Sequence, residues 1–458
     1  MMRPNPRPLP RIAHGAATLV VVMVLFFIVA LVAAYTSRNL IFEQRTSANQ
    51  YRAAQAFEAA EAGVEWALTM LNSGRIDAAC VPQNNPATSD ESFRMRYLSI
   101  DADGLVTARL RSDGTPRQAA CVFNGSDWQC DCPEDPALSL SAPSGTGSFP
   151  AFVLRFHDRA PDGTVYPAGV LRIESTGCTR LDSGGAVCAS STSSGDGQAT
   201  VNAVVALKSA LPAPPGAALS VRVDLDLSGA GPLNLTNTDA GSGGITLRVG
   251  GTVNGTPQAL NGPAGTPSDP SNLARNVTVA NPDGWLNDLT TTPWDPTKPL
   301  SDRMFAAVFA ADRDTVRLQP AAVYVDCRPS CTASGVHLDD LASLNPGRVL
   351  WIDGDLDIDI SDPIGRAASP ALLVITGNLE ASDSAAQVNG VVYLMENATG
   401  PTLTTTGTLL LNGALIAESG LSLSGGGTSS IVYDAAMLDL LRRESGSFVR
   451  VPGGWKDF

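Results

Sequence analysis

The first strong pattern along the chain is an uncharged apolar stretch that runs into a one-sided apolar stripe. Residues 16–37 carry no charge, and about 20 such residues in a helix span about 30 Å of hydrocarbon. No Pro or Gly interrupts residues 16–62, and a helix stop follows at Asn72-Ser73-Gly74. The pattern predicts one continuous helix over 16–72, roughly 85 Å long. Its second half has apolar residues at three- and four-residue steps, on one face: Phe57, Ala60, Val64, Ala67, Leu68 and Leu71.

Three interpretations of the N-terminal segment are open from the residues alone. Residues 1–14 hold three arginines and no acid, so they are expected to stay in the cytoplasm while the rest of the chain lies outside. The segment is a plain signal anchor, a cleaved secretory signal ending at Val32-Ala33-Ala34, or a leader cut after Gly15. The apolar core is longer than the roughly 7–15 residues of a secretory signal. The unbroken continuation into an amphipathic helix favours the third interpretation.

Short strands are predicted after the helix. Residues 152–156, 170–175 and 201–207 have strand composition and partial alternation. We expect them to form an antiparallel sheet against the second half of the long helix. Residues 210–216 are Pro-rich and predict a stiff linker between domains.

A repeat of 23 residues appears in the last quarter of the chain. Gly354, Gly377 and Gly400 keep this interval, and each is followed by a leucine; Asn389-Gly390 recurs as Asn412-Gly413. A fixed period predicts the stacked coils of a β-solenoid, with a β-sandwich as the alternative. Residues 218–253 are expected to add earlier coils, and residues 434–443 to form a helix that caps the open end.

Two stretches interrupt the predicted coils as insertions between the early and late coils. Residues 257–285 are expected to form loops, and Ser301 to cap a helix with Met304, Phe305, Val308 and Phe309 facing a core. The predicted organisation is a leader (1–15), a transmembrane and amphipathic helix (16–76), a β-sheet region (77–209), a linker (210–216), a β-rich region with loop and helix insertion (217–344), and solenoid repeats with a helical cap (345–458).

Composition, charge and cysteine count restrict the class of protein to which the chain can belong. The net charge is −14 with only 17% charged residues, and no basic cluster favours nucleic acid. Eight cysteines beside an export signal indicate disulfides rather than zinc. The pairing is open; the short local loops make Cys178 with Cys188 and Cys327 with Cys331 the candidate pairs.

The search for chemistry finds no enzyme signature and one acidic row. No nucleophile elbow, P-loop, zinc-protease helix or dinucleotide fingerprint is present, so the chain is not expected to be an enzyme or to need a cofactor. Alternation places Asp353, Asp355, Asp357 and Asp359 on one strand face. This row is either a solvated edge-protecting face or a weak calcium site.

Three segments resemble the PilX-type minor pilins of the type IV pilus. Residues 11–22 (RIAHGAATLVVV) look like the leader junction of that family, residues 56–63 (AFEAAEAG) like its second N-terminal motif, and residues 451–458 (VPGGWKDF) like its C-terminal ending. The resemblance covers the first 75 or so residues well, the final hundred or so moderately and the middle hardly at all. It implies a long transmembrane and stalk helix with a pilin-like antiparallel β head. Together with the β-solenoid-like or β-sandwich domain that the repeat predicts at the C-terminal end, the expected fold class is α+β.

The resemblance also implies a function. A prepilin peptidase would cut between Gly15 and Ala16 and methylate the new amine. The protein would sit once through the inner membrane with its bulk in the periplasm, and then in the pilus at the cell surface. Its partners would be the major pilin, other minor pilins and a large tip adhesin. The assembly helix would use Ala16, Leu19, Val20, Phe26, Phe27, Phe57 and Val64.

One departure from the pilin pattern concerns the fifth mature position, which is Val20 where most pilins carry Glu. The absence of this Glu fits a subunit that sits at a tip or initiates a filament; the alternative is that helix packing alone suffices for assembly. Two rivals remain. The K-type pseudopilin of type II secretion also lacks this Glu, but would carry a mostly α-helical insert. A membrane-anchored β-solenoid that binds carbohydrate or acts as an adhesin is the other.

Overall fold

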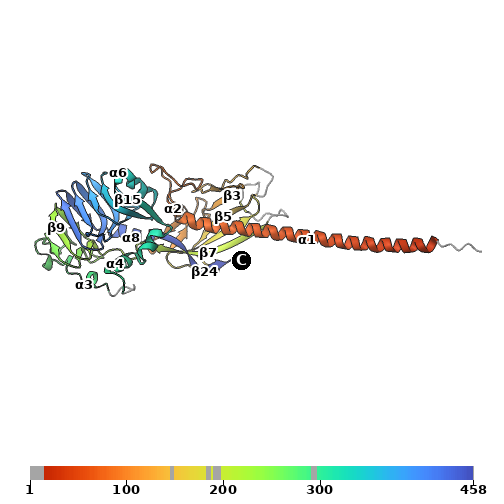
Figure 1. The fold of residues 1–458 in the computed structure, drawn as a ribbon, viewed down its shortest axis with the longest axis horizontal. Helices are drawn as coiled ribbons and strands as arrows, with labels where there is room; N and C mark the ends of the chain where they lie inside the picture. Colours follow the sequence, from red (N-terminus) through yellow and green to blue (C-terminus); the bar gives the residue numbers. More distant parts are fainter. Residues whose placement is uncertain (1–14, 145–148, 182–186, 189–196, 290–296, 457–458) are drawn as a thin grey trace, which may run out of the picture.

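Three parts follow one another along a single long axis. The structure is a computed structural model that describes residues 15–144, 149–181, 187–188, 197–289 and 297–456. A long helix, α1, projects from one end, a β-sheet head surrounds its other end, and a larger β-solenoid lies beyond the head (Figure 1).

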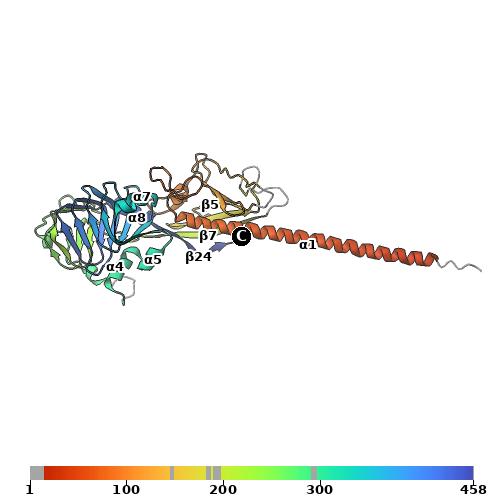
Figure 2. The ribbon, with the colours of Figure 1, turned by 45° about the horizontal axis from the view of Figure 1, so that its top comes forward.

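Helix α1 (Gly15–Leu71) is continuous over 57 residues, which confirms the predicted rod. Its free half carries no other element of the structure, as the second view also shows (Figure 2). The helix ends where expected: the Ser73 hydroxyl and backbone N–H both donate to the carbonyl of Met70. Such side-chain and backbone bonds satisfy carbonyls that a helix end leaves open.

The head is a six-stranded antiparallel sheet in the order β24-β7-β6-β5-β3-β4, packed against the second half of α1. Three strands fall where the sequence predicts them. A short helix and a two-stranded ribbon precede the sheet. The bounds are α2 Phe93–Tyr97, β1 Leu98–Ile100, β2 Val106–Ala108, β3 Ala119–Phe123, β4 Trp128–Asp131, β5 Ala151–His157, β6 Val170–Cys178, β7 Gln198–Ser209 and β24 Gly446–Lys456.

The whole solenoid is inserted between two neighbouring strands of the head sheet. Strand β7 ends at Ser209, and its antiparallel partner β24 begins at Gly446, directly opposite Ser209. The predicted assignment of residues 345–458 to one solenoid domain is therefore wrong at its end, because β24 belongs to the head. Sequence alone did not show this return, since the pairing joins residues more than 230 positions apart.

The solenoid is a stack of parallel coils with three β faces around one apolar core. The predicted 23-residue period is confirmed: Leu356 pairs with Leu379, and Asn389-Gly390 with Asn412-Gly413. Parallel pairing throughout this sheet excludes the β-sandwich. Leucine, isoleucine and valine from all three faces fill the interior.

The coils do not stack in chain order. The chain enters at β8, in the body of the stack, and β8 pairs with β21 from the last repeat on one side and with β11 on the other. From there it winds to the far end, returns through α4 and α5, and starts again at β15 beside the head (Figure 1). The predicted boundary at 344/345 is not found, because strands from both sides of it form one sheet.

Each face of the solenoid has its own strands. The first contains β8 Ala217–Val221, β11 Ile245–Val249, β14 Val279–Ala280 and β17 Ala371–Ile375; the second β9 Leu225–Ala230, β12 Val253–Asn254, β18 Leu379–Ala381, β20 Thr402–Thr405 and β22 Leu421–Gly425; the third β10 Leu233–Thr236, β13 Ala259–Asn261 and β23 Thr428–Val432. Four longer strands turn a corner and serve two faces: β15 Ala322–Thr332, β16 Val349–Ile358, β19 Ala386–Leu394 and β21 Thr408–Ala417.

Helices cover the outside of the first face. The predicted helix at 434–443 forms, as α8 (Ala435–Glu444), but it does not cap the end of the stack. Its Leu438 and Leu441 pack with α4 (Leu300–Phe309) against the outer surface of the sheet. Ser301 lies inside α4 and is not its cap, since the N-cap residue is Pro299. The remaining helices are η1 Leu273–Arg275, α3 Gly284–Asp288, α5 Arg313–Leu318, α6 Ala333–Val336 and α7 Leu338–Leu344.

Candidate functional site

The free half of α1 exposes apolar side chains on every side. Leu19, Val20, Phe26 and Phe27 are all exposed, and Phe26 keeps 74% of its surface open. Among the described residues this is the one helix long and apolar enough to cross a membrane. Because each large apolar side chain gains roughly 1.5–3 kcal/mol when it leaves water, this surface needs a lipid or protein environment.

The second half of α1 is fixed to the head by close backbone contact. Val64 is buried, and Phe57 is half-buried beside it. A Cβ built on Gly177 of β6 would lie 2.2 Å from the carbonyl oxygen of Ala56, and one on Gly63 would lie 2.3 Å from the Ser175 hydroxyl. Glycine at these two positions lets helix and sheet approach more closely than any side chain permits.

The end of α1 is joined to the last strand of the chain. The amide of Asn72 donates to the Phe448 carbonyl at 3.0 Å and accepts from the Phe448 N–H at 2.8 Å. Asn72 thus replaces a neighbouring strand at the edge of β24. Lower on the same strand, Arg450 forms an ion pair with Glu65 at 2.6 Å.

Arg94 is the buried hub of this junction. Its Nε donates to Leu71 O at 3.1 Å, and its two terminal nitrogens donate to Glu444 O at 2.6 Å and Gly446 O at 2.7 Å. The guanidinium also lies 4.9 Å from the ring centroid of Phe448. Burial lowers the pKa of Arg94 to about 10, so it stays charged at neutral pH. The hub holds helix, head and solenoid in one arrangement.

Sequence patterns do not identify Asn72 or Arg94 as site residues. The pattern at Asn72 predicts only a helix stop, and Arg94 lies in a short helix that no periodicity marks. The sequence signal at this position is a pair of arginines, Arg94 and Arg96, enclosed by the aromatic residues Phe93 and Tyr97.

The predicted processing site lies at the beginning of the described chain. Gly15 is the first residue of α1 and Ala16 the second; residues 1–14 of the predicted leader lie outside the described residues. Val20, at the fifth position after Gly15, is exposed on the free helix. Cleavage itself stays a prediction.

The acidic row does not form one cluster. Gly354 adopts φ 134° and turns the strand at a corner of the coil, so Asp353 lies on a different face from the three aspartates after it. Each carboxylate accepts bonds from its own surroundings, from Tyr324 and Thr376 at Asp353, Asn378 at Asp355, Ser382 at Asp357 and Ser334 at Asp359. Among the described residues no three His, Cys, Asp or Glu side chains are arranged around a metal position.

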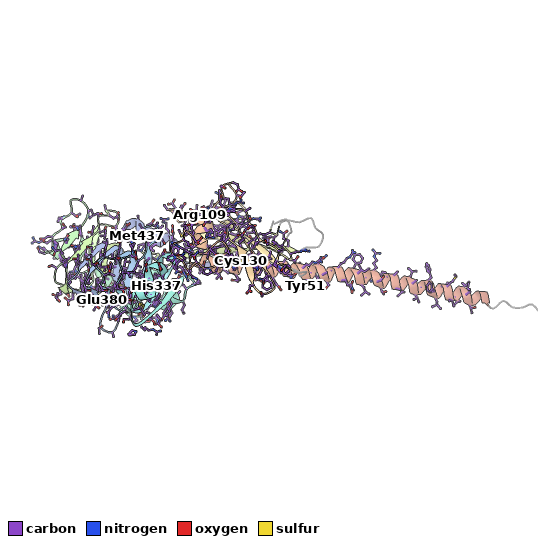
Figure 3. All side chains as sticks on the ribbon, turned by 90° about the horizontal axis from the view of Figure 1, so that it is seen from above. Tyr51, Arg109, Cys130, His337, Glu380 and Met437 are labelled. Carbon is purple, nitrogen blue, oxygen red and sulfur yellow. A yellow bond between two sulfur atoms is a disulfide. The ribbon has the colours of Figure 1, made fainter. Side chains whose placement is uncertain are left out.

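All eight cysteines form disulfides, which stabilise the head and one coil. The structure contains both candidate pairs, Cys178–Cys188 and Cys327–Cys331. It adds two pairs that spacing left open, Cys80–Cys132 and Cys121–Cys130. Cys121–Cys130 links the neighbouring strands β3 and β4, near the position labelled Cys130 in Figure 3. Zinc ligation by these thiols is thereby excluded.

These features define a class: a pilin-like protein, with an apolar helix that projects from an antiparallel β head. Residues 14–65 match the family described as PilX N-terminal, which relates the helix to the minor pilins of the type IV pilus. Among solved structures, the competence-associated pilin ComZ from Thermus thermophilus aligns at 14% identity over 89% of this chain and 97% of its own. Its TM-score of 0.20 does not establish a shared fold. No curated protein matches the chain.

Proposed function

We propose that this chain is a minor pilin of the type IV pilus that helps to initiate assembly at the pilus tip. The observation that supports this most directly is the continuity of α1. One unbroken helix of 57 residues carries a free apolar stretch and a last segment, from Ala56 onward, with one face buried against the head. The first half can exchange lipid for neighbouring helices, since both are apolar, while the second half keeps the head in a fixed orientation.

In this proposal the protein is inserted in the inner membrane with its head in the periplasm. A prepilin peptidase removes residues 1–15 and methylates the amine of Ala16. Most pilins carry a Glu at this position, and its carboxylate pairs with a neighbour's N-terminal amine. Because a carboxylate in lipid costs free energy, that Glu is retained only where it has a function. In this chain Val20 takes its place. A subunit without it suits the tip, where the major pilin and other minor pilins lie below it and a large tip adhesin beside it.

The mature N-terminus tests the processing step. Mass spectrometry of the chain from its native membrane should find N-methylated Ala16, and the G15V variant should retain residues 1–15. An intact Met1, or a start near Tyr35, in the wild-type protein would contradict the proposal.

The filament that contains the chain separates the proposal from the pseudopilin rival. That rival is expected to carry a mostly α-helical insert, whereas the insert between β7 and β24 here is a β-solenoid. Sheared pili should contain the protein in small amounts, and its deletion should reduce the number of pili. A chain found only in type II secretion preparations would favour the pseudopilin.

A further inference from the structure

The part of α1 between the apolar stretch and the head carries its charges in two stripes. Arginine recurs every seven residues, at Arg38, Arg45 and Arg52. Seven residues make nearly two turns, so these side chains form one line with a drift of about 20° per step. A second line contains only glutamates: Glu43, Glu58, Glu61 and Glu65. At 100° per residue, the two stripes are centred roughly 175° apart.

Ion pairs between the two stripes do not stabilise the helix that carries them. Arginine and glutamate support an isolated helix when they stand three or four residues apart, and no Arg–Glu pair between Arg38 and Glu58 has that spacing. Within the described part of the chain, none of the three guanidinium groups has an ion pair; Arg38 instead lies 5.7 Å from the Phe42 ring centroid. On the acidic side, only Glu65 is paired, with Arg450. Among the described residues, Arg45 and Arg52 have no ion pair within the chain, so their guanidinium groups can pair with another molecule.

The arginine stripe lies on the side of α1 that faces the head, below the point where the head begins. Ala59 and Gly63 are buried against the head, and their helical angles fall on the arginine side. A Cβ built on Gly197 would lie 2.5 Å from the carbonyl of Arg52, which marks the lower limit of the head. Tyr51, 70% exposed, is labelled at this limit in Figure 3. From there to Arg38 every side chain is exposed.

We propose that the arginine stripe docks the stalk helix of a neighbouring filament subunit that presents an acidic stripe. The inference rests on the proposed function, because packing of the apolar halves brings the polar stretches of neighbouring helices together. At that contact, matched charges attract and like charges repel. The acceptor is an acidic helix with the geometry that this chain itself shows at Glu58 and Glu65.

The spacing of the two stripes gives the contact a direction. Glu58 and Glu65 follow Arg45 and Arg52 by 13 residues each, which is about 20 Å along a helix. A parallel neighbour with an equivalent acidic stripe meets both arginines at about that axial offset. Basic and acidic stripes on opposite sides make the contact heterologous, the type that builds open filaments rather than closed dimers.

A photo-cross-linking residue at position 49, which lies between Arg45 and Arg52 on the same side, tests the inference in the full-length chain in cells. The cross-linked peptide should come from the N-terminal helix of another pilin and carry two or more Asp or Glu residues. The R45E/R52E variant should lower the cross-link yield about tenfold, as expected for the loss and reversal of two partly screened pairs. R180E/R275E, with the same charge change on exposed sites, should leave the yield unchanged.

The outcomes separate this inference from the proposed function. Protease resistance of the disulfide-bonded head verifies that each variant folds. A wild-type chain that is absent from sheared pili overturns the proposed function and this inference together. A chain that is present there overturns the docking inference alone if R45E/R52E cross-links as the wild type does, or if position 49 cross-links only to lipid or to a helix without acids.

Discussion

Arg94 shows how much of the arrangement depends on one side chain. It bonds to carbonyls at the end of α1, the end of α8 and the beginning of β24. These carbonyls have little access to water, so a lost donor leaves them unsatisfied. A buried charge of this kind stabilises the fold only when all of its hydrogen bonds are made.

Replacement of Arg94 by Met should destabilise the full-length protein by about 3–5 kcal/mol, because it removes three buried bonds at once. Urea unfolding of the detergent-solubilised chain measures the change. R109M is the matched control: Arg109 pairs with Glu91 at 3.2 Å on the half-exposed surface, and its loss should cost less than about 1 kcal/mol. Equal effects for the two variants would contradict the role of Arg94 as the hub.

Glu418 is a second buried charge, at a corner of the solenoid. It is fully buried, and its two carboxylate oxygens accept from Arg313 and from the Glu396 N–H, both at 2.8 Å. Burial raises the pKa of Glu418 to about 7, although Arg313 opposes the shift. The folded state therefore holds a proton on Glu418 more tightly than the unfolded chain, whose Glu has a pKa near 4.5.

The stability that protonated Glu418 contributes is present below pH 4.5 and is lost as pH rises through 7. Relative to E418Q, which stays neutral, the wild type should lose about 3 kcal/mol between pH 4.5 and 8. Unfolding of both proteins across this range gives the difference. A difference that does not change with pH would show that Glu418 ionises normally in the fold.

Among the elements, those that depend only on residues close together in the sequence were predictable. The rod follows from an unbroken pattern of apolar residues, and the 23-residue period follows from glycines at the coil corners. Gly390 and Gly413 have φ 146° and 133° and are stacked. A Cβ on Gly390 would lie 1.8 Å from Ala371 O, so only glycine fits there.

G390A should destabilise the solenoid by about 3 kcal/mol or more, because the added methyl meets backbone that cannot move away. G426A is the matched control, since a Cβ on Gly426 meets nothing within 4 Å and its φ is not positive. Thermal unfolding followed by circular dichroism should separate the two variants by more than about 5 °C. Similar melting temperatures would show that this corner tolerates side chains.

Elements that depend on distant pairing were not predictable. The position of β8 between two other coils depends on contacts with β21, nearly 200 residues later. The placement of α8 on the outer face depends on Phe305 and Tyr393, which lie far from it in sequence. Likewise, the amphipathic pattern of α8 predicts that this helix buries one face, but it does not predict which surface of the protein that face packs against. For the same reason the candidate site was found only where its residues are local, in α1, and not at Asn72 or Arg94.

At the scale of the whole molecule, the solenoid joins the head at the adjacent ends of one strand pair, β7 and β24. Ser209 and Gly446 are paired neighbours, so a two-residue Asn-Gly turn in place of residues 210–445 closes a β7–β24 hairpin. The shortened chain should fold with its three head disulfides intact, at lower stability because Arg94 loses the Glu444 carbonyl. Non-reducing peptide mapping and limited proteolysis measure this. Scrambled disulfides or complete digestion would show that the head needs the solenoid to fold.

Because β24 is the last strand of the chain, the head sheet is complete only when the whole chain has been synthesised. A chain that stops anywhere inside the solenoid contains α1 but leaves β7 with a bare edge and Asn72 without the Phe448 backbone. Such fragments present an open strand to proteases and chaperones. A truncated product is thus expected to be degraded faster than the full-length chain.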